Sequence, residues 1–236
     1  MKTIGLLGGM SWESTAIYYR AINEGVKNTL GGFHSAKILL NSLEFGHLEQ
    51  LMQEEQWDTI EEILIANART VDRAGADFLV VCTNTMHKIV PKIQEHISIP
   101  ILHIVDATAG VLLAKGIKKV GLLGTTFTME HDFYKGRLMN KFGIEVVVPI
   151  AEDRNHIHRI IDEICMGDCN DHSKQEYLRI ITSLQDQGAE AVILGCTEIG
   201  ILVKDGDADI PLLDTTLIHA EAAVKMALST QTTEMA

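Results

Sequence analysis

The feature that most constrains the fold of this chain is an internal repeat. Three segments of the first half recur in the second half, in the same order and at a nearly constant spacing, so the two halves are expected to fold as similar lobes. Likeness between apolar strands explains a match such as GLLG, but it does not explain two Cys-Thr pairs at matching positions. The pairs are IGLLGG (4–9) with VGLLGT (120–125), GADFLVVCTNT (75–85) with GAEAVILGCTEI (188–199), and IPILHIVDAT (99–108) with IPLLDTTLIHA (210–220).

Short apolar runs alternate with longer amphipathic segments in both halves. This pattern predicts an α/β fold in which each lobe is a short parallel sheet flanked by helices on both faces. We expect an N-terminal lobe at 1–103, completed by a C-terminal helix within 214–236, and a C-terminal lobe at 104–213. The predicted strands are 2–7, 37–43, 78–81, 101–103, 119–123, 145–148, 191–194 and 211–213, and the predicted helices are 12–30, 57–74, 86–96, 106–115, 130–142, 156–165, 173–187 and 218–228.

Composition excludes several classes of protein. The formal net charge of −12 disfavours nucleic acid and anionic membrane surfaces as partners. No apolar stretch approaches the roughly 18 residues of a membrane-spanning helix, and the first residues lack the features of a signal peptide. The 4 cysteines are too few for a disulfide scaffold, so reduced thiols and a cytoplasmic location are expected.

Four polar motifs follow predicted strands, where open parallel sheets bind their ligands. If the lobes face each other about a pseudo-twofold axis, these motifs line one cleft and Cys82 opposes Cys196. The motifs are Gly8-Gly9-Met10-Ser11, Cys82-Thr83-Asn84-Thr85, Gly124-Thr125-Thr126-Phe127-Thr128 and Gly195-Cys196-Thr197-Glu198.

Such a pair of cysteines can invert a carbon centre. A thiolate on one side removes a proton, and a thiol on the other side delivers one, so the reverse reaction exchanges the two roles. The thiol of free cysteine has a pKa of about 8.5, and a helix N-terminus lowers that pKa. The surrounding hydroxyl and amide groups suit a carboxylate whose charge grows in an enediolate-like transition state.

These residues resemble the aspartate/glutamate racemase family of cofactor-independent amino-acid racemases. The resemblance is strongest to the bacterial branch that is specific for L-aspartate and glutamate or has broad specificity. It implies two α/β lobes, racemisation without pyridoxal phosphate or another cofactor, a small amino-acid substrate and a homodimer. It rests on IGLLGGMSWEST (4–15), VVCTNTMHK (80–88), LLGTTFTME (122–130) and ILGCTEIG (193–200).

The resemblance also implies roles for single residues. Cys82 and Cys196 would be the acid and base, although Thr83 has been proposed for the first face in this branch. We prefer Cys82 because a thiol is a far stronger acid than a hydroxyl, and we keep Thr83 as a possible partner. The implied substrate-binding residues are Met10, Ser11, Thr83, Asn84, Thr85 and Thr197, to which the strand-end motifs add Thr125, Thr128 and Glu198.

Recognition of a distal carboxylate is less well defined. Family members that act on acidic substrates carry a basic residue on the helix that here contains Cys165, and the 47–56 loop offers only Gln53 and Gln56. The remaining basic candidates are Arg154, His156 and Lys174. A neutral or broad substrate range is therefore an open alternative.

Other interpretations also remain open. Cys165 and Cys169 with His172 fit a zinc site poorly, because the spacing is wide and a fourth ligand is missing. His87 either tunes Cys82 or satisfies a helix, and Glu198 either binds an amino group or caps a helix. At the level of the whole protein, the alternatives are a hydantoin racemase, a maleate isomerase, a decarboxylase or a non-catalytic carboxylate-binding module.

Overall fold

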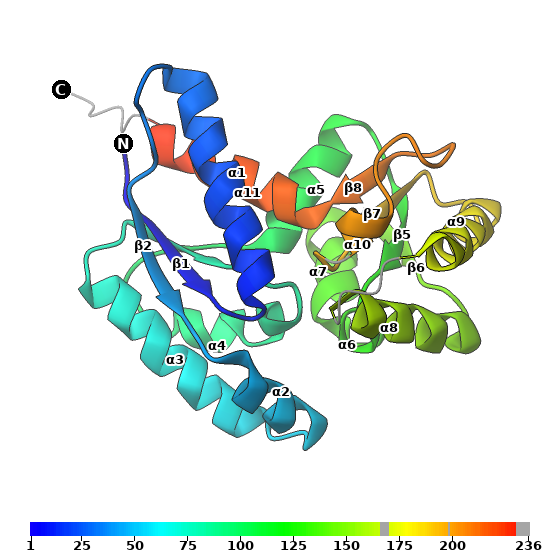
Figure 1. Cartoon of the computed structure of the whole chain (residues 1–236), viewed down its shortest axis with the longest axis horizontal. Coiled ribbons are helices and arrows are strands. Elements are labelled where there is room, and N and C mark those ends of the chain that lie inside the picture. Colours follow the sequence, from blue (N-terminus) through cyan, green and yellow to red (C-terminus); the bar gives the residue numbers. More distant parts are fainter. Residues whose placement is uncertain (166–169, 198, 230–236) are drawn as a thin grey trace. The chain divides into compact units, whose positions relative to one another are not determined.

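The computed structural model describes residues 1–165, 170–197 and 199–229 (Figure 1). No side chain is described for Asp162, Cys165 or Ile201. The chain forms two compact units, of which unit 1 comprises Met1–Cys82, Ile89–His103 and His219–Ala236, and unit 2 comprises Thr83–Lys88 and Ile104–Ile218.

These units differ in two places from the lobes expected from the sequence. Residues 83–88 belong to unit 2, so the chain changes unit between Cys82 and Thr83. The chain returns to unit 1 at His219, inside the last helix, rather than at residue 214.

The sheet of unit 1 has four parallel strands in the order β2-β1-β3-β4. β1 and β3 are buried along their whole length, as expected for central strands that are covered on both faces. β1 pairs with β3 from Ile4↔Phe78 onward. The strands are β1 (Ile4–Gly8), β2 (Ile38–Ser42), β3 (Phe78–Val81) and β4 (Ile101–Leu102).

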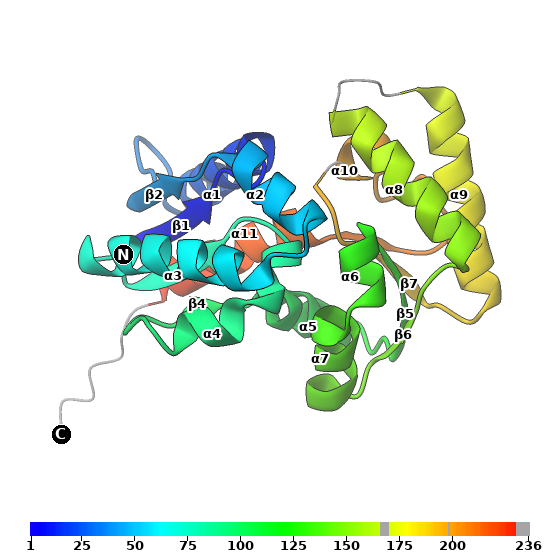
Figure 2. The ribbon, with the colours of Figure 1, turned by 90° about the horizontal axis from the view of Figure 1, so that it is seen from below.

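Helices cover both faces of this sheet (Figures 1 and 2). On one face, apolar residues of β1 and β3 pack against α1 and α11, with Tyr18 and Val224 in the same cluster. On the other face, a Cβ added at Gly5 would collide with Val71 of α3, so the absence of a side chain there allows close helix packing. The helices are α1 (Trp12–Leu30), α2 (Phe45–Gln53), α3 (Trp57–Arg73), α4 (Val90–Gln94) and α11 (Thr215–Leu228), of which α11 begins in unit 2.

The sheet of unit 2 has the same architecture, with four parallel strands in the order β6-β5-β7-β8. One face packs against α5 and α7, and the other packs against α8 and α9. The strands are β5 (Lys119–Leu123), β6 (Glu145–Val147), β7 (Ala191–Leu194) and β8 (Leu212–Asp214). The helices are the 3-10 turn η1 (Thr85–Lys88), α5 (Ile104–Ala114), α6 (Thr126–Glu130), α7 (Asp132–Phe142), α8 (Ala151–Cys165), α9 (Asp171–Asp186) and α10 (Ile199–Leu202).

The predicted α/β class is therefore confirmed, and so is the repeat of one architecture. Both sheets place their strands in equivalent order, so β3 of unit 1 corresponds to β7 of unit 2. Each of these two strands is followed, directly or after one glycine, by a Cys-Thr pair.

Several predicted helices needed correction. The helix predicted at 86–96 is two pieces, η1 and α4, because Pro91 lies at the start of α4, where its missing N–H is tolerated. The helix predicted at 130–142 begins two residues later, as α7, because His131 before it is in an extended conformation. The short helices α2, α6 and α10 were not predicted.

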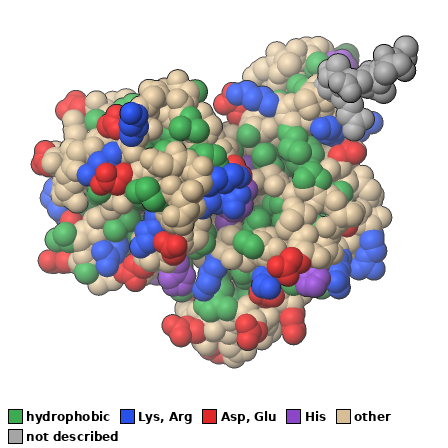
Figure 3. Space-filling view, turned by 180° about the vertical axis from the view of Figure 1, so that it is seen from behind, with side chains coloured by type: hydrophobic (Ala, Val, Ile, Leu, Met, Phe, Trp, Pro, Cys, Tyr) green, Lys and Arg blue, Asp and Glu red, His purple; other side chains and the backbone are tan. Residues whose placement is uncertain are grey.

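Within the described residues, no helix combines the length and the apolar character needed to cross a bilayer. On the face shown in Figure 3, acidic and basic side chains are interspersed.

Candidate functional site

The loop between β1 and α1 is built around Gly9 and Thr15. The Gly9 N–H donates to Thr15 Oγ1 at 2.7 Å, and the Thr15 hydroxyl donates to the Ser11 carbonyl at 2.9 Å. Ser11 Oγ accepts the N–H of Ser14 at 3.3 Å and so caps α1. Met10 is buried. The predicted binding residues Met10 and Ser11 therefore lie on a loop whose polar atoms already stabilise the helix start.

Cys82 lies at the end of β3, inside the core of unit 1. Its side chain belongs to the apolar cluster between the sheet and helices α1 and α11. Its N–H donates to the Leu7 carbonyl at 2.9 Å, and its carbonyl accepts the Ser14 hydroxyl at 3.0 Å. The thiol donates to the Val80 carbonyl at 3.9 Å. Burial raises the pKa of the Cys82 thiol, so the neutral form is favoured.

Thr83 is the first residue of unit 2 and is half-buried, in contrast to the fully buried Cys82. Its carbonyl accepts a hydrogen bond from His87 Nδ1 at 2.8 Å. Of the two neighbouring residues in the Cys-Thr pair, Thr83 is the one whose side chain has the more accessible surroundings.

Asn84 is linked to the end of β7 through Thr215. Asn84 Nδ2 donates to Thr215 Oγ1 at 3.1 Å, and the Thr215 hydroxyl donates to the Leu194 carbonyl at 2.9 Å. Because a carbonyl only accepts, this chain fixes the orientation of the Asn84 amide. Asn84 Oδ1 is buried and has no hydrogen-bond partner among the described residues, so it is an acceptor still available to a donor.

Three threonines continue this polar cluster in unit 2. Thr85 Oγ1 lies 3.4 Å from Thr125 Oγ1, and Thr125 Oγ1 lies 3.3 Å from Thr128 Oγ1. Thr125 also caps α6 by accepting the Thr128 N–H at 3.4 Å. The structure thus brings together the predicted residues Asn84, Thr85, Thr125 and Thr128 at the carboxyl end of the unit 2 sheet.

Cys196 follows β7 after Gly195, and it is partly exposed where it packs against the core of unit 2. The Gly195 N–H donates to the Leu123 carbonyl at 2.6 Å, so Cys196 leaves the sheet beside β5. Thr197 is also half-buried. Glu198, predicted to bind an amino group or cap a helix, lies outside the described residues.

Asp214 ends β8 beside this motif. Its Oδ1 accepts the N–H groups of Thr216 and Leu217, at 2.8 and 3.1 Å, and so caps α11. Burial raises the pKa of Asp214, although these backbone hydrogen bonds oppose that shift.

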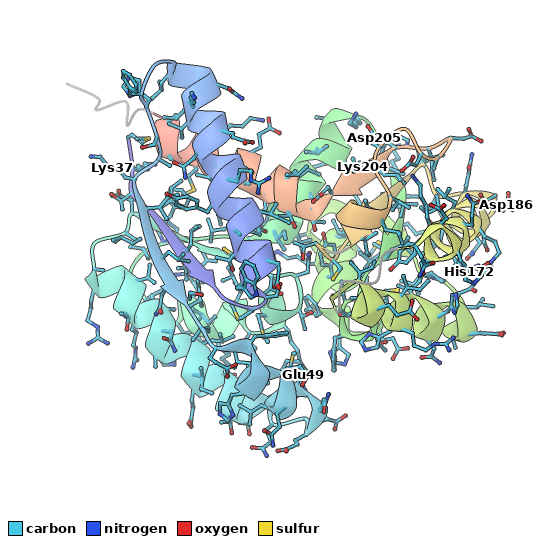
Figure 4. The ribbon with its side chains drawn as sticks, viewed as in Figure 1. Lys37, Glu49, His172, Asp186, Lys204 and Asp205 are labelled. Carbon is cyan, nitrogen blue, oxygen red and sulfur yellow. The ribbon has the colours of Figure 1, made fainter. Side chains whose placement is uncertain are left out.

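Two of the three basic candidates for a distal carboxylate are paired within unit 2, because Arg154 binds Glu130 at 2.9 Å and Lys174 binds Asp207 at 2.9 Å. His156 Nε2 lies 3.9 Å from Glu176, beyond hydrogen-bond distance, and this buried atom has no hydrogen-bond partner within the described residues. Asp207 follows the loop residues Lys204 and Asp205, which Figure 4 labels together with His172 on α9.

The glutamine candidates belong to α2 and the turn that follows it in unit 1, where Figure 4 labels Glu49. Gln53 donates to Glu49, and Gln56 donates to Glu54 at 2.7 Å. Each candidate of either kind therefore has an acidic neighbour in its own unit.

No group of three or more His, Cys, Asp or Glu side chains that could hold a metal ion is found within the described residues. The thiols of the weak zinc hypothesis, Cys165 and Cys169, lie outside that description, so it does not test them.

The hydroxyls of Ser14, Thr15 and Thr215, which hold the strand-end loops, were not predicted from the sequence. One signal was available for Thr215, because it lies in the third repeated segment immediately after a strand. Ser14 and Thr15 carried a weaker signal, as hydroxyl residues in the first turn of a helix that follows a Gly-Gly loop.

A family model described as Asp/Glu/hydantoin racemase matches residues 7–223. Among curated proteins, the broad-specificity amino-acid racemase of Bacillus subtilis (strain 168) is 22% identical over 239 residues, which cover 97% of this chain and 99% of that protein.

Two solved structures resemble the whole chain. A candidate Asp/Glu racemase from Yersinia pestis is 50% identical with a TM-score of 0.92, and the match covers 97% of this chain and 100% of that one. An aspartate racemase homologue from Pyrococcus horikoshii OT3 is 35% identical with a TM-score of 0.86, at the same coverage.

Proposed function

This chain belongs to the Asp/Glu/hydantoin racemase family, and from that premise we propose that it is a cofactor-independent amino-acid racemase. It interconverts the enantiomers of aspartate, glutamate or a broader set of amino acids. Proton removal from one face of Cα and proton delivery to the other face produce the inversion.

The observation that supports this proposal is the matched placement of two Cys-Thr pairs. β3 and β7 occupy the same position in two sheets of the same order. Cys82-Thr83 follows the first strand, and Cys196-Thr197 follows the second. A two-base inversion uses one proton-transferring group on each face of the carbon, whereas a simple binding site does not need a matched pair.

We assign one face of the substrate to Cys196, a residue that is partly exposed. We assign the other face to the Cys82-Thr83 pair. Within this pair, the Cys82 thiol is buried and hydrogen-bonded to Val80, so Thr83 is assigned the contact with the substrate. Thiol acidity favours Cys82 instead, and the variants below separate the two assignments.

Neutral hydroxyl and amide groups surround the assigned residues of unit 2. Hydroxyl donors such as those of Thr85, Thr125 and Thr197 suit the substrate carboxylate, whose negative charge increases in the transition state. The amide nitrogen of Asn84 donates to Thr215, so we assign the remaining acceptor, Asn84 Oδ1, to the substrate ammonium group.

The range of amino acids that the protein accepts depends on what binds the side-chain end of the substrate. Because Arg154 and Lys174 each have an acidic partner, and both glutamine candidates donate to glutamates, we propose a range that includes neutral amino acids. The Bacillus subtilis relative, a broad-specificity racemase, supports this range.

The test is exchange of the α-proton in deuterium oxide. Single enantiomers of acidic and neutral amino acids are incubated with the protein, and loss of the α-proton signal is followed by NMR alongside chiral chromatography. Exchange with racemisation is expected for at least one amino acid. Absence of exchange over a broad panel would contradict the proposal.

Three variants test the assigned residues. Cys196→Ala and the near-isosteric Thr83→Val are expected to abolish racemisation, because each removes one proton-transferring group. Cys82→Ala is expected to lose stability by about 1–2 kcal/mol, as for a small core deletion, while racemisation persists. Loss of activity in folded Cys82→Ala, with Thr83→Val active, would transfer the role to Cys82.

A further inference from the structure

We propose that His87 is a positioning residue that holds Thr83 in its working geometry by binding the Thr83 carbonyl. This inference deepens the proposed function and rests on it. His87 lies in the turn η1, four residues after Thr83, and its side chain is 1% exposed.

The two ring nitrogens of His87 have different partners. Nδ1 lies 2.8 Å from the Thr83 carbonyl, which only accepts, so Nδ1 carries the proton and donates. Nε2 lies 3.2 Å from the Ile104 N–H, which only donates, so Nε2 presents its lone pair. These bonds fix one neutral tautomer, since an imidazolium would place a second proton against the Ile104 N–H.

The acceptor side of His87 connects this turn to a buried helix. Ile104 is the first residue of α5, and the N–H groups of the first helical turn have no partner within their own helix. Ile104, Val105 and Leu112 of α5 are buried in a core cluster of unit 2. Through Nε2, the imidazole is thus attached to a rigid part of unit 2.

The other ring nitrogen, Nδ1, holds the carbonyl of Thr83. The carbonyl of Thr83 shares a peptide plane with Asn84, so a fixed carbonyl restricts the backbone on the C-terminal side of Thr83. On the N-terminal side, the Cys82 carbonyl accepts the Ser14 hydroxyl at 3.0 Å within unit 1. Both peptide planes that flank the Thr83 Cα are therefore hydrogen-bonded to buried side chains, which restricts the direction in which its side chain leaves the backbone.

Two variants separate the two bonds of His87. In His87→Asn, the amide lies near the position of Nδ1 and can donate to Thr83, but the bond to Ile104 is lost. In His87→Gln, the amide reaches the position of Nε2 and can accept from Ile104, but the bond to Thr83 is lost. If His87 acts by holding Thr83, turnover depends on the bond from His87 to Thr83 and not on the bond from Ile104 to His87.

The expected result is a loss of kcat of about 10- to 100-fold in His87→Gln with little change in KM, as for a misplaced reacting group. His87→Asn should recover most of this kcat. A second readout is the primary isotope effect with each α-deuterated enantiomer. Slowing proton transfer on one face should increase this effect for one enantiomer and decrease it for the other.

His219→Gln is the matched control. His219 is also buried between two hydrogen bonds, to Tyr18 at 2.9 Å and to the Leu102 carbonyl at 2.8 Å, but on α11. This variant should lower stability and leave the isotope effects of both enantiomers at their native values. Equal kcat in the two His87 variants, or native isotope effects in His87→Gln, would overturn the positioning role. Racemisation by the native chain would not be affected by that outcome.

Hydrogen–deuterium exchange at residues 83–88 tests the same role without substrate. His87→Gln should speed amide exchange in this segment, and His87→Asn should not. Unchanged exchange in His87→Gln would overturn the inference. Failure of the native chain to racemise any amino acid would instead refute the proposed function, and the exchange result would still decide whether His87 holds Thr83.

Discussion

Burial fixes the protonation state of His219. Its Nε2 donates to the Leu102 carbonyl, so its Nδ1 accepts the Tyr18 hydroxyl. Desolvation lowers the pKa of His219 to about 4, below its ordinary value of about 6.5. The ring therefore stays neutral in the folded chain and joins α1, β4 and α11 within unit 1.

This shift predicts how stability depends on pH. Between about pH 6.5 and pH 4, the unfolded chain binds a proton at His219 that the folded chain does not bind, so stability falls as the pH falls. The shift sets an upper limit of about 3 kcal/mol on this loss, at roughly 1.4 kcal/mol for each pH unit. Urea unfolding at pH 7 and pH 4.5 should show a smaller pH-dependent loss for His219→Gln than for the native chain. An equal loss would contradict the assignment.

The burial of Cys82 shows where sequence reasoning reached its limit. Phe78, Val80 and Cys82 alternate along β3 and its end, and all three belong to the same core cluster. That alternation was readable from the sequence. The face of the sheet that α11 would cover was not, because it depends on a segment more than a hundred residues away.

The turn from β1 into α1 depends on a glycine that no other residue replaces easily. Gly9 has a φ of 85°, a region that L side chains rarely adopt. A Cβ added there would also collide with the backbone of Leu43 just beyond β2. The backbone cannot yield as a flexible side chain would.

Gly9→Ala is expected to destabilise the chain by about 3 kcal/mol or more, because conformational strain and a backbone collision add together. Gly75→Ala is the matched control: its φ of 92° is similar, but nothing lies within 4 Å of an added Cβ. The control should cost only the strain, about 1–2 kcal/mol. Urea denaturation of both variants measures the difference, and equal losses would show that the Leu43 collision is relieved.

The long periodic elements were predictable, and the short ones were not. The helix at 12–30 and the strands at 78–81, 119–123 and 191–194 match their predicted bounds, since their apolar spacing identifies them. α10 has only four residues, too few for a helical period. The hydrogen bonds between Asn84 and Thr215 and between Thr85 and Thr125 also escaped prediction, because each joins residues far apart in the sequence.

For the assembled protein, the homodimer stays a prediction that the resemblance supports. Exposed aromatic residues in unit 1 offer apolar surface to a second copy: Trp12 is 67% exposed and Tyr19 is 54% exposed, both on α1. Native mass spectrometry at micromolar concentration should give twice the mass of the chain. A purely monomeric spectrum would contradict the prediction. The double variant Trp12→Ser, Tyr19→Ser is the comparison, and it should give less dimer than the native chain.

The interleaving of the two units has a consequence for synthesis on the ribosome. Unit 2 ends at Ile218, whereas unit 1 needs α11, whose Ala220, Ala223 and Val224 close its core and whose Ala227 carbonyl accepts the Lys2 N–H at 2.9 Å. The first strand to be translated must therefore wait for the last helix before its surroundings are complete. In nascent chains halted before α11 emerges, α1 alone would cover that face of the early sheet, and the part left exposed would attract chaperones.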